Sequence, residues 1–173
     1  MRDDDDTERL LIEIGRVRNG FKEPTLKHRN GDLEMSGVRS DPREMESEIV
    51  IDPLFQEALD GVEGFSHIMV IYWTGLRKTD SLKVHPAGQR DVPSKGLFST
   101  RSPARPNPLA ITTVEMMERD GNRLRVRGLD AIDGTMVVDI KPHLPLYDAP
   151  VGASMPKWMS ELQGRFSEDR EEV

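Results

Sequence analysis

The sequence contains no cysteine, so disulfide bonds, thiolate nucleophiles and cysteine-based zinc sites are excluded from its chemistry. It also has no apolar run near the ~20 residues that a membrane-spanning helix requires. The first eight residues are acidic and do not resemble a signal or transit peptide. We therefore expect a cytoplasmic protein with no membrane association.

A further absence concerns nucleotide-binding motifs. No G-x-G-x-x-G run is present and strands do not alternate with helices, which excludes the doubly wound dinucleotide-binding fold. Instead, about seven segments have strand-like composition and are joined mostly by turns. The predicted strands are 10–17, 48–51, 66–74, 97–99, 109–117, 123–129 and 136–140. Only two short helices are predicted, one starting at Asp52-Pro53 and one over 155–162. The fold class is thus mainly β, a compact barrel or sandwich.

The chain length of 173 residues predicts one domain. Residues 1–8 include four consecutive Asp and are expected to be disordered, because like charges repel and cannot pack. The domain is expected to span 9–164, and the tail 165–173 is expected to be loose. A polar stretch from 19 to 46 is predicted as a long loop, a length that is typical of functional or mobile segments.

Charge is distributed unevenly along the chain, whose formal net charge is −7. Much of the negative charge lies in the two termini. Residues 77–105 instead carry seven Lys and Arg against two Asp, a local surplus of +5. Such a surplus could contact nucleic-acid phosphates. The alternative is a solvated loop in an ordinary acidic protein.

The proline-rich segment, residues 100–108, breaks the pattern of strands and turns. Three prolines within six residues fix φ and prevent a regular ladder, so the segment is expected to be stiff. It presents Arg101, Ser102, Arg105 and Asn107 at fixed spacing, and arginine suits phosphate, carboxylate or a stacked base. The segment predicts a rigid ligand wall. The alternative is a turn with surface arginines.

A second unusual segment, residues 128–142, gathers three carboxylates and a lysine near turns and strand ends. Asp133 precedes Gly134, and an Asp-Gly pair is common in turns. Asp130 and Asp139 adjoin apolar residues and need partners, for which Lys141 or Arg101 could serve. The alternative is an ion-pair network that closes the barrel. The four histidines have no metal-ligand spacing, and Trp73 and Trp158 are predicted to be packing residues.

Four runs of the sequence, in order along the chain, resemble the signatures of one family. They are Ile14-Gly15-Arg16-Val17-Arg18, the run 61–68 (GVEGFSHI), the run 96–109 (GLFSTRSPARPNPL) and the run 129–142 (LDAIDGTMVVDIKP). The family is the TsaA-like family, also called TrmO, and the similarity covers roughly residues 10–147. Four matches in the family's order are specific for the family, whereas the proline-rich match alone would not be.

The resemblance implies a β-barrel that dimerises and binds S-adenosylmethionine near the subunit interface. It also implies methyl transfer to N6 of threonylcarbamoyladenosine beside the anticodon of tRNA. The implied cofactor contacts are Arg29, Thr74, Gly75, Arg101, Ser102, Arg105, Leu109, Ile111, Gly128, Leu129 and Asp130. For the chemistry, Asp130 or Asp133 could accept the proton from N6 or orient N6, and Asn107 could read the base edge or the cofactor amide.

Some positions depart from the family pattern. Arg29 lies where the family often has Pro-Arg-Gln, Leu109-Ala110 replaces Ile-Gly, and His143 replaces a tyrosine. Two alternatives therefore stay open. One is the same cofactor and fold with a different methyl acceptor, such as another RNA base, a protein or a small molecule. The other is a non-catalytic barrel that binds RNA or nucleotides.

Overall fold

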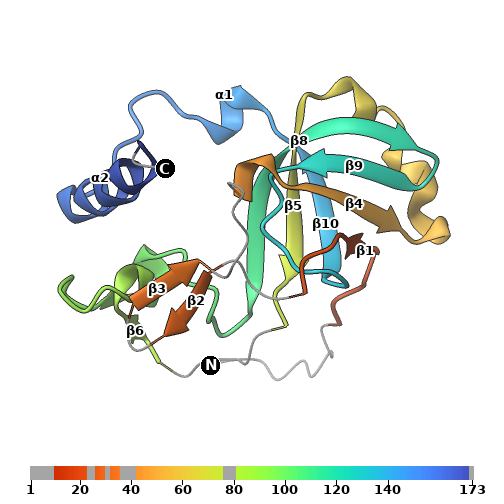
Figure 1. Ribbon diagram of the computed structural model, residues 1–173. Coiled ribbons are helices and arrows are strands. Elements are labelled where there is room, and N and C mark those ends of the chain that lie inside the picture. Colours follow the sequence, from red (N-terminus) through yellow and green to blue (C-terminus); the bar gives the residue numbers. More distant parts are fainter. Residues whose placement is uncertain (1–9, 23–25, 30–31, 36–41, 76–80, 172–173) are drawn as a thin grey trace, which may run out of the picture.

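The computed structural model describes residues 10–22, 26–29, 32–35, 42–75 and 81–171. Six strands close into an antiparallel barrel in the order β1-β10-β5-β8-β9-β4, and β4 pairs back onto β1 (Figure 1). The barrel strands are β1 (Gly15–Arg18), β4 (Glu46–Ile51), β5 (His67–Trp73), β8 (Leu109–Asp120), β9 (Arg123–Arg127) and β10 (Met136–Pro142). This architecture confirms the prediction of a mainly β barrel.

Smaller elements surround the barrel. Two antiparallel pairs join β2 (Leu26–Arg29) to β3 (Asp32–Met35) and β6 (Lys83–Val84) to β7 (Lys95–Gly96). The 3-10 helices are η1 (Pro42–Glu44), η2 (Pro53–Leu59), η3 (Val62–Gly64), η4 (Pro86–Gly88) and η5 (Leu97–Ser99). The α-helices are α1 (Pro145–Asp148) and α2 (Lys157–Glu171). No helix among the described residues is long and apolar enough to cross a membrane.

The core fills the inside of the barrel because the strands alternate between inward and outward side chains. On β5, Ile68, Val70 and Tyr72 point inward and are buried. On β9, Leu124 and Val126 do the same. Removing these apolar side chains from water is the main stabilising contribution to the closed barrel.

Turn chemistry connects the strands where the sequence predicts it. Asp120 pairs with Arg123, which leaves Gly121 and Asn122 as a two-residue hairpin loop. Gly121 has φ of 58°, the left-handed conformation that such loops require. Asp52 caps η2, because its Oδ1 accepts a hydrogen bond from the Leu54 amide at 2.9 Å.

Before the C-terminal helix, three segments differ from their sequence predictions. The first strand starts at Gly15 and not at residue 10, and Leu10, Leu11 and Ile12 are exposed. Residues 97–99 form a 3-10 turn and not a strand, because the Thr100 amide donates back to the Leu97 carbonyl at 3.1 Å. The polar stretch 19–46 contains the β2–β3 hairpin and η1, so it is not one continuous loop.

The C-terminal helix is longer than the sequence predicted. It runs from Lys157 to Glu171, so most of the tail expected to be loose is helical. A helix-interior glycine such as Gly164 costs only about 1 kcal/mol relative to alanine, and the contacts of Leu162 and Arg165 with the rest of the chain oppose that cost. Residues 1–8, predicted to be disordered, lie outside the described residues.

Candidate active site

Three strand ends meet at one end of the barrel. Trp73, the last residue of β5, pairs with Leu109, the first of β8, and with Met136, the first of β10. The segments that adjoin these residues therefore meet there too: Thr74-Gly75, the proline-rich segment and the 128–135 loop. The barrel thus brings together the two segments that the sequence singled out for their chemistry.

The proline-rich segment is held by hydrogen bonds at both ends. The buried Pro108 offers its carbonyl to both the amide and the hydroxyl of Thr74, at 2.9 and 3.1 Å. At the other end, Thr100 is buried and its hydroxyl donates to the Leu97 carbonyl at 2.8 Å. The Arg105 guanidinium donates to the Thr100 carbonyl. These contacts agree with the predicted stiff wall, and they turn Arg105 back onto its own segment.

Arg101 lies along the open edge of β8. Its Nη2 donates to the Ile111 carbonyl at 3.0 Å, so the structure joins two of the predicted cofactor contacts. This carbonyl is accessible because β9 pairs with β8 only from Glu115 onward. The Arg101 side chain is exposed, so donors that Ile111 does not use face solvent.

Tyr72 links the site to the barrel interior. Its hydroxyl donates to the Asp130 carbonyl at 2.6 Å and lies 3.2 Å from the Thr112 hydroxyl. Burial raises the pKa of Tyr72, and the negative charge of Asp130 raises it further, while the hydrogen bond with Thr112 and the positive charge of Arg101 lower it. Tyr72 is thus a protonated donor at neutral pH.

Replacing Tyr72 with phenylalanine is expected to destabilise the protein by about 1–3 kcal/mol, because the Asp130 carbonyl loses its donor and the Thr112 hydroxyl loses its hydrogen-bond partner, both in a part-buried position. Urea denaturation measures this difference. Tyr147→Phe is the matched control, since Tyr147 is exposed and should tolerate the change. Equal stability of the two variants would show that the Tyr72 hydroxyl does not hold the Asp130 loop.

The 128–135 loop is braced by the residues that follow β1. The Asp133 Oδ1 accepts a hydrogen bond from the Asn19 amide at 3.1 Å, and the Asp133 amide donates to Phe21 at 2.7 Å. The Asn19 side chain also donates to the Ala131 carbonyl at 2.9 Å. One oxygen of Asp133 is therefore engaged in holding the loop. At the start of the loop, Leu129 is fully buried in the core, so only its backbone can face a ligand.

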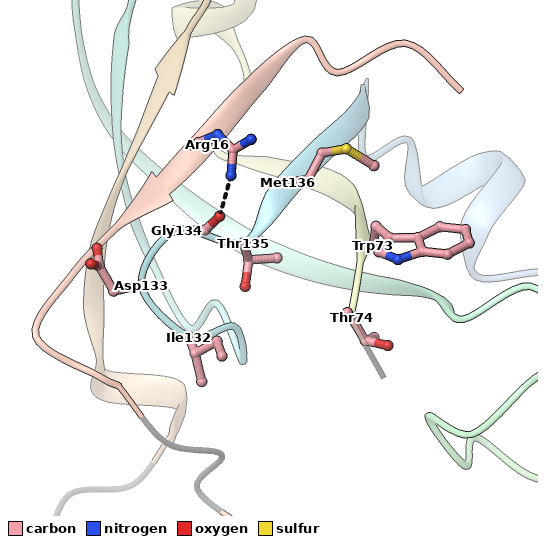
Figure 2. A pocket seen from close by; sticks show the side chains of 9 residues that line it. Arg16, Trp73, Thr74, Ile132, Asp133, Gly134, Thr135 and Met136 are labelled. Carbon is pink, nitrogen blue, oxygen red and sulfur yellow. Dashed lines mark hydrogen bonds between the residues drawn. The ribbon is translucent and has the colours of Figure 1, made fainter. Parts of the chain in front are cut away.

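A pocket of about 260 Å³ opens beside this loop (Figure 2). Its lining residues are Arg16, Trp73, Thr74, Gly75, Ile132, Asp133, Gly134, Thr135 and Met136. Strand register sets Arg16, Met136 and Trp73 in one cross-strand row on the outside of the barrel. Trp73, predicted to be a packing residue, is half-buried and lines this pocket. Its position, one residue after the inward Tyr72, is the signal that points it outward.

Arg16 contributes to the pocket mainly by holding part of its wall in place, and less by its charge. Its Nη1 donates to the Gly134 carbonyl at 3.1 Å, and its Nη2 and Nε pair with the two oxygens of the Glu13 carboxylate, each at 2.6 Å. The guanidinium therefore fixes the turn at Asp133-Gly134 (Figure 2).

The remaining residues singled out by the sequence lie in several places. Asp139 pairs with Lys141 at 2.7 Å, and it is half-exposed and not buried. His143 follows the far end of β10, about 20 Å along the strand from Met136, which removes it from the candidate site. Asn107 is exposed, and Arg29 ends β2 opposite Asp32 of β3. Within the described residues, no group of His, Asp and Glu could hold a metal ion.

A closed six-stranded barrel with a stiff arginine-bearing segment and a carboxylate-bearing loop at one end defines a class of ligand-binding barrel distinct from doubly wound folds. The model of the tRNA-methyltransferase O N-terminal domain matches residues 34–149. The chain belongs to this family.

Relatives and solved structures agree with this assignment. A probable S-adenosyl-L-methionine-binding protein of Methanothermobacter thermautotrophicus is 46% identical over 138 residues, covering 80% of this chain and 92% of the relative. An S-adenosyl-L-methionine-binding protein of Archaeoglobus fulgidus is 40% identical over 139 residues, with the same two coverages. A crystal structure of TrmO superposes with a TM-score of 0.62 at 28% identity, over 84% of this chain and 62% of that one. The chain thus spans about three fifths of that solved protein.

Proposed function

We propose that this protein transfers a methyl group from S-adenosylmethionine to N6 of threonylcarbamoyladenosine beside the anticodon of tRNA, in the cytoplasm. The observation that carries the proposal is the meeting of the proline-rich segment and the 128–135 loop around Tyr72. The family match, and relatives that are themselves named for binding S-adenosyl-L-methionine, support the cofactor.

The residues at this end of the barrel fit the chemistry of that cofactor. Trp73, Met136 and Ile132 supply apolar surface for an adenine ring or a thioether chain. The exposed guanidinium of Arg101 suits the carboxylate of the methionine moiety. The hydroxyls of Thr74 and Thr135 can bind polar edges of a nucleoside. We propose these residues, with the backbone at Gly75, Leu109, Gly128 and Leu129, as the cofactor site, with Arg29 and Ser102 as further contacts.

When bound, the cofactor supplies a methyl group on a positively charged sulfur. The acceptor N6 is attached to a carbonyl and is a weak nucleophile until its proton leaves. We assign proton acceptance to Asp130, which is exposed at the site and whose backbone Tyr72 holds in place. Asp133 is better suited to positioning, because one of its oxygens already holds the loop. Asn107, exposed on the stiff wall, is suited to reading the edge of the base.

A second copy of the chain would complete the site. The pocket of about 260 Å³ is smaller than the roughly 300–1,000 Å³ of typical small-molecule sites. Beside it, the outer apolar strip, made of Ile71, Trp73, Ile111 and Met136, lies on the outside of β5, β8 and β10. By contrast, the outside of β4 and β9 carries ion pairs such as Glu48–Arg123 and Glu46–Arg127, which suit solvent. We propose that two copies pair through the outer apolar strip.

The proposal is tested by incubating the purified protein with methyl-labelled S-adenosylmethionine and two tRNA preparations. One comes from cells that make threonylcarbamoyladenosine, and the other from cells that cannot make it. We expect label only in the first, and mass spectrometry of the nucleosides should place the methyl group on N6. Label in both preparations would indicate another RNA base. Cofactor binding without any transfer to RNA would indicate another acceptor, and RNA binding without cofactor binding would indicate a non-catalytic barrel.

A further inference from the structure

The β6–β7 unit, residues 81–99, is an ordered structure beside the barrel. Pro86, Val92 and Leu97 are buried within it. The Leu97 amide donates to the Leu82 carbonyl at 2.9 Å, and His85 Nδ1 lies 2.9 Å from the Val92 carbonyl. This part of the basic stretch 77–105 therefore has a defined surface.

Helix α2 holds this unit from one side (Figure 1). Arg165 pairs with Asp91 at 2.6 Å, and the Lys95 ammonium lies 5.3 Å from the centre of the Trp158 ring. The ion pair keeps the pKa of Asp91 below its ordinary value, so this carboxylate is charged and matched by Arg165. Asp91 is the only acidic residue in 81–99. The charge left for a partner is therefore positive, from the exposed Lys83 and Arg90.

Phe98 projects from the same unit into solvent. Its side chain is 80% exposed, although its neighbour Leu97 is buried. Leu82, hydrogen-bonded through its carbonyl to Leu97, is also exposed and extends the apolar surface. Phe98 precedes Arg101 by three residues, so the two Cα atoms are at most about 11 Å apart. The exposed ring therefore lies close to the candidate site.

We propose that the β6–β7 unit docks single-stranded RNA, with Phe98 stacking on a base and with Lys83 and Arg90 contacting phosphates. An exposed aromatic ring on a unit that carries exposed cations is the arrangement by which proteins bind single strands, because every base has a face that can stack. The positive surface complements RNA and not a second acidic copy of this chain, whose net charge is −7. This inference rests on the proposed function, which supplies the identity of the RNA. What it adds is the surface of the protein that binds this RNA.

The test uses fluorescence anisotropy with the full chain and a labelled RNA hairpin that carries an anticodon-type loop. Phe98→Ala should weaken binding about tenfold, the effect of one lost stacking contact. Phe98→Tyr should keep the wild-type affinity, because the aromatic face is retained. Leu54→Ala is the control, since Leu54 on η2 is equally exposed at 81%. The affinity for a blunt RNA duplex should change little in Phe98→Ala.

Salt dependence separates the two kinds of contact. The plot of log affinity against log salt should lose about 0.7 of slope for each phosphate contact removed by Lys83→Ala or Arg90→Ala. Phe98→Ala should leave the slope unchanged, because stacking releases no counterions.

Three results would overturn the docking surface. They are wild-type RNA affinity in Phe98→Ala, no binding of the hairpin by the wild-type protein, and a change of oligomeric mass in Phe98→Ala, which would show that a second copy covers the ring. Titration with S-adenosylmethionine tests the proposed function independently of RNA binding. Methyl transfer that survives Phe98→Ala with unchanged RNA affinity contradicts only the docking surface. Loss of RNA binding in Phe98→Ala by a protein that transfers no methyl group contradicts only the proposed function.

Discussion

Arg101→Ala is expected to weaken S-adenosylmethionine binding at least tenfold in isothermal titration calorimetry. The guanidinium is the exposed cation that the structure fixes at the site, through its hydrogen bond to Ile111, and a charge-assisted hydrogen bond to a carboxylate is worth more than a tenfold change in affinity. Arg101→Lys should recover only part of the loss, because an ammonium keeps the charge but lacks the planar fork.

The control for Arg101→Ala is Arg123→Ala. Arg123 is also an exposed arginine in an outward position, but it pairs with Glu48 on the charged face of the barrel. Its replacement should leave cofactor affinity unchanged. If both variants bind the cofactor as tightly as the wild-type protein does, Arg101 is not a cofactor contact, and the proline-rich segment serves another ligand.

Ile71→Asp is expected to halve the molecular mass measured by light scattering and to reduce methyl transfer strongly. Ile71 lies on the outer apolar strip, paired across the sheet with Ile111 and Asp139, so an added carboxylate there would be buried without a partner in a dimer. In a monomer the same carboxylate would face solvent, and the barrel should stay folded, as circular dichroism can check.

Val50→Asp is the matched control for the dimer variant. Val50 is a β-branched residue in an outward position on β4, opposite Arg16 and Arg123, on the charged side of the barrel. It should leave the mass and the transfer rate near those of the wild-type protein. A wild-type protein that is already monomeric and active, or an Ile71→Asp variant that stays dimeric, would rule out pairing through the outer apolar strip.

Local signals in the sequence were sufficient for most of the barrel. The alternation at Leu124 and Val126 predicts the strand and its buried face, and Asp120-Gly121 predicts the hairpin that precedes it. These features depend on neighbours within a few residues, so periodicity and turn chemistry report them directly. The C-terminal helix was predicted too short, and the contact of its later part with the β6–β7 unit, Arg165 with Asp91, joins residues far apart in the sequence.

For the candidate site, too, the sequence determined one part and the tertiary structure the other. The sequence by itself determined which residue types are available: the stiff segment with Arg101 and Arg105, the carboxylates at Asp130 and Asp133, and four runs specific enough to indicate the family. It could not show that one oxygen of Asp133 is engaged by the Asn19 amide, because that contact joins residues 114 positions apart.

Only closure of the barrel decided how these groups are arranged. The hydroxyl of Tyr72 reaches the Asp130 backbone across 58 residues, and the row of Arg16, Met136 and Trp73 draws one residue from each of three strands. Strand register sets such neighbours, and register is a property of the whole sheet. Composition and motifs therefore identify the chemistry of this protein, whereas the closed sheet determines which residues share a pocket.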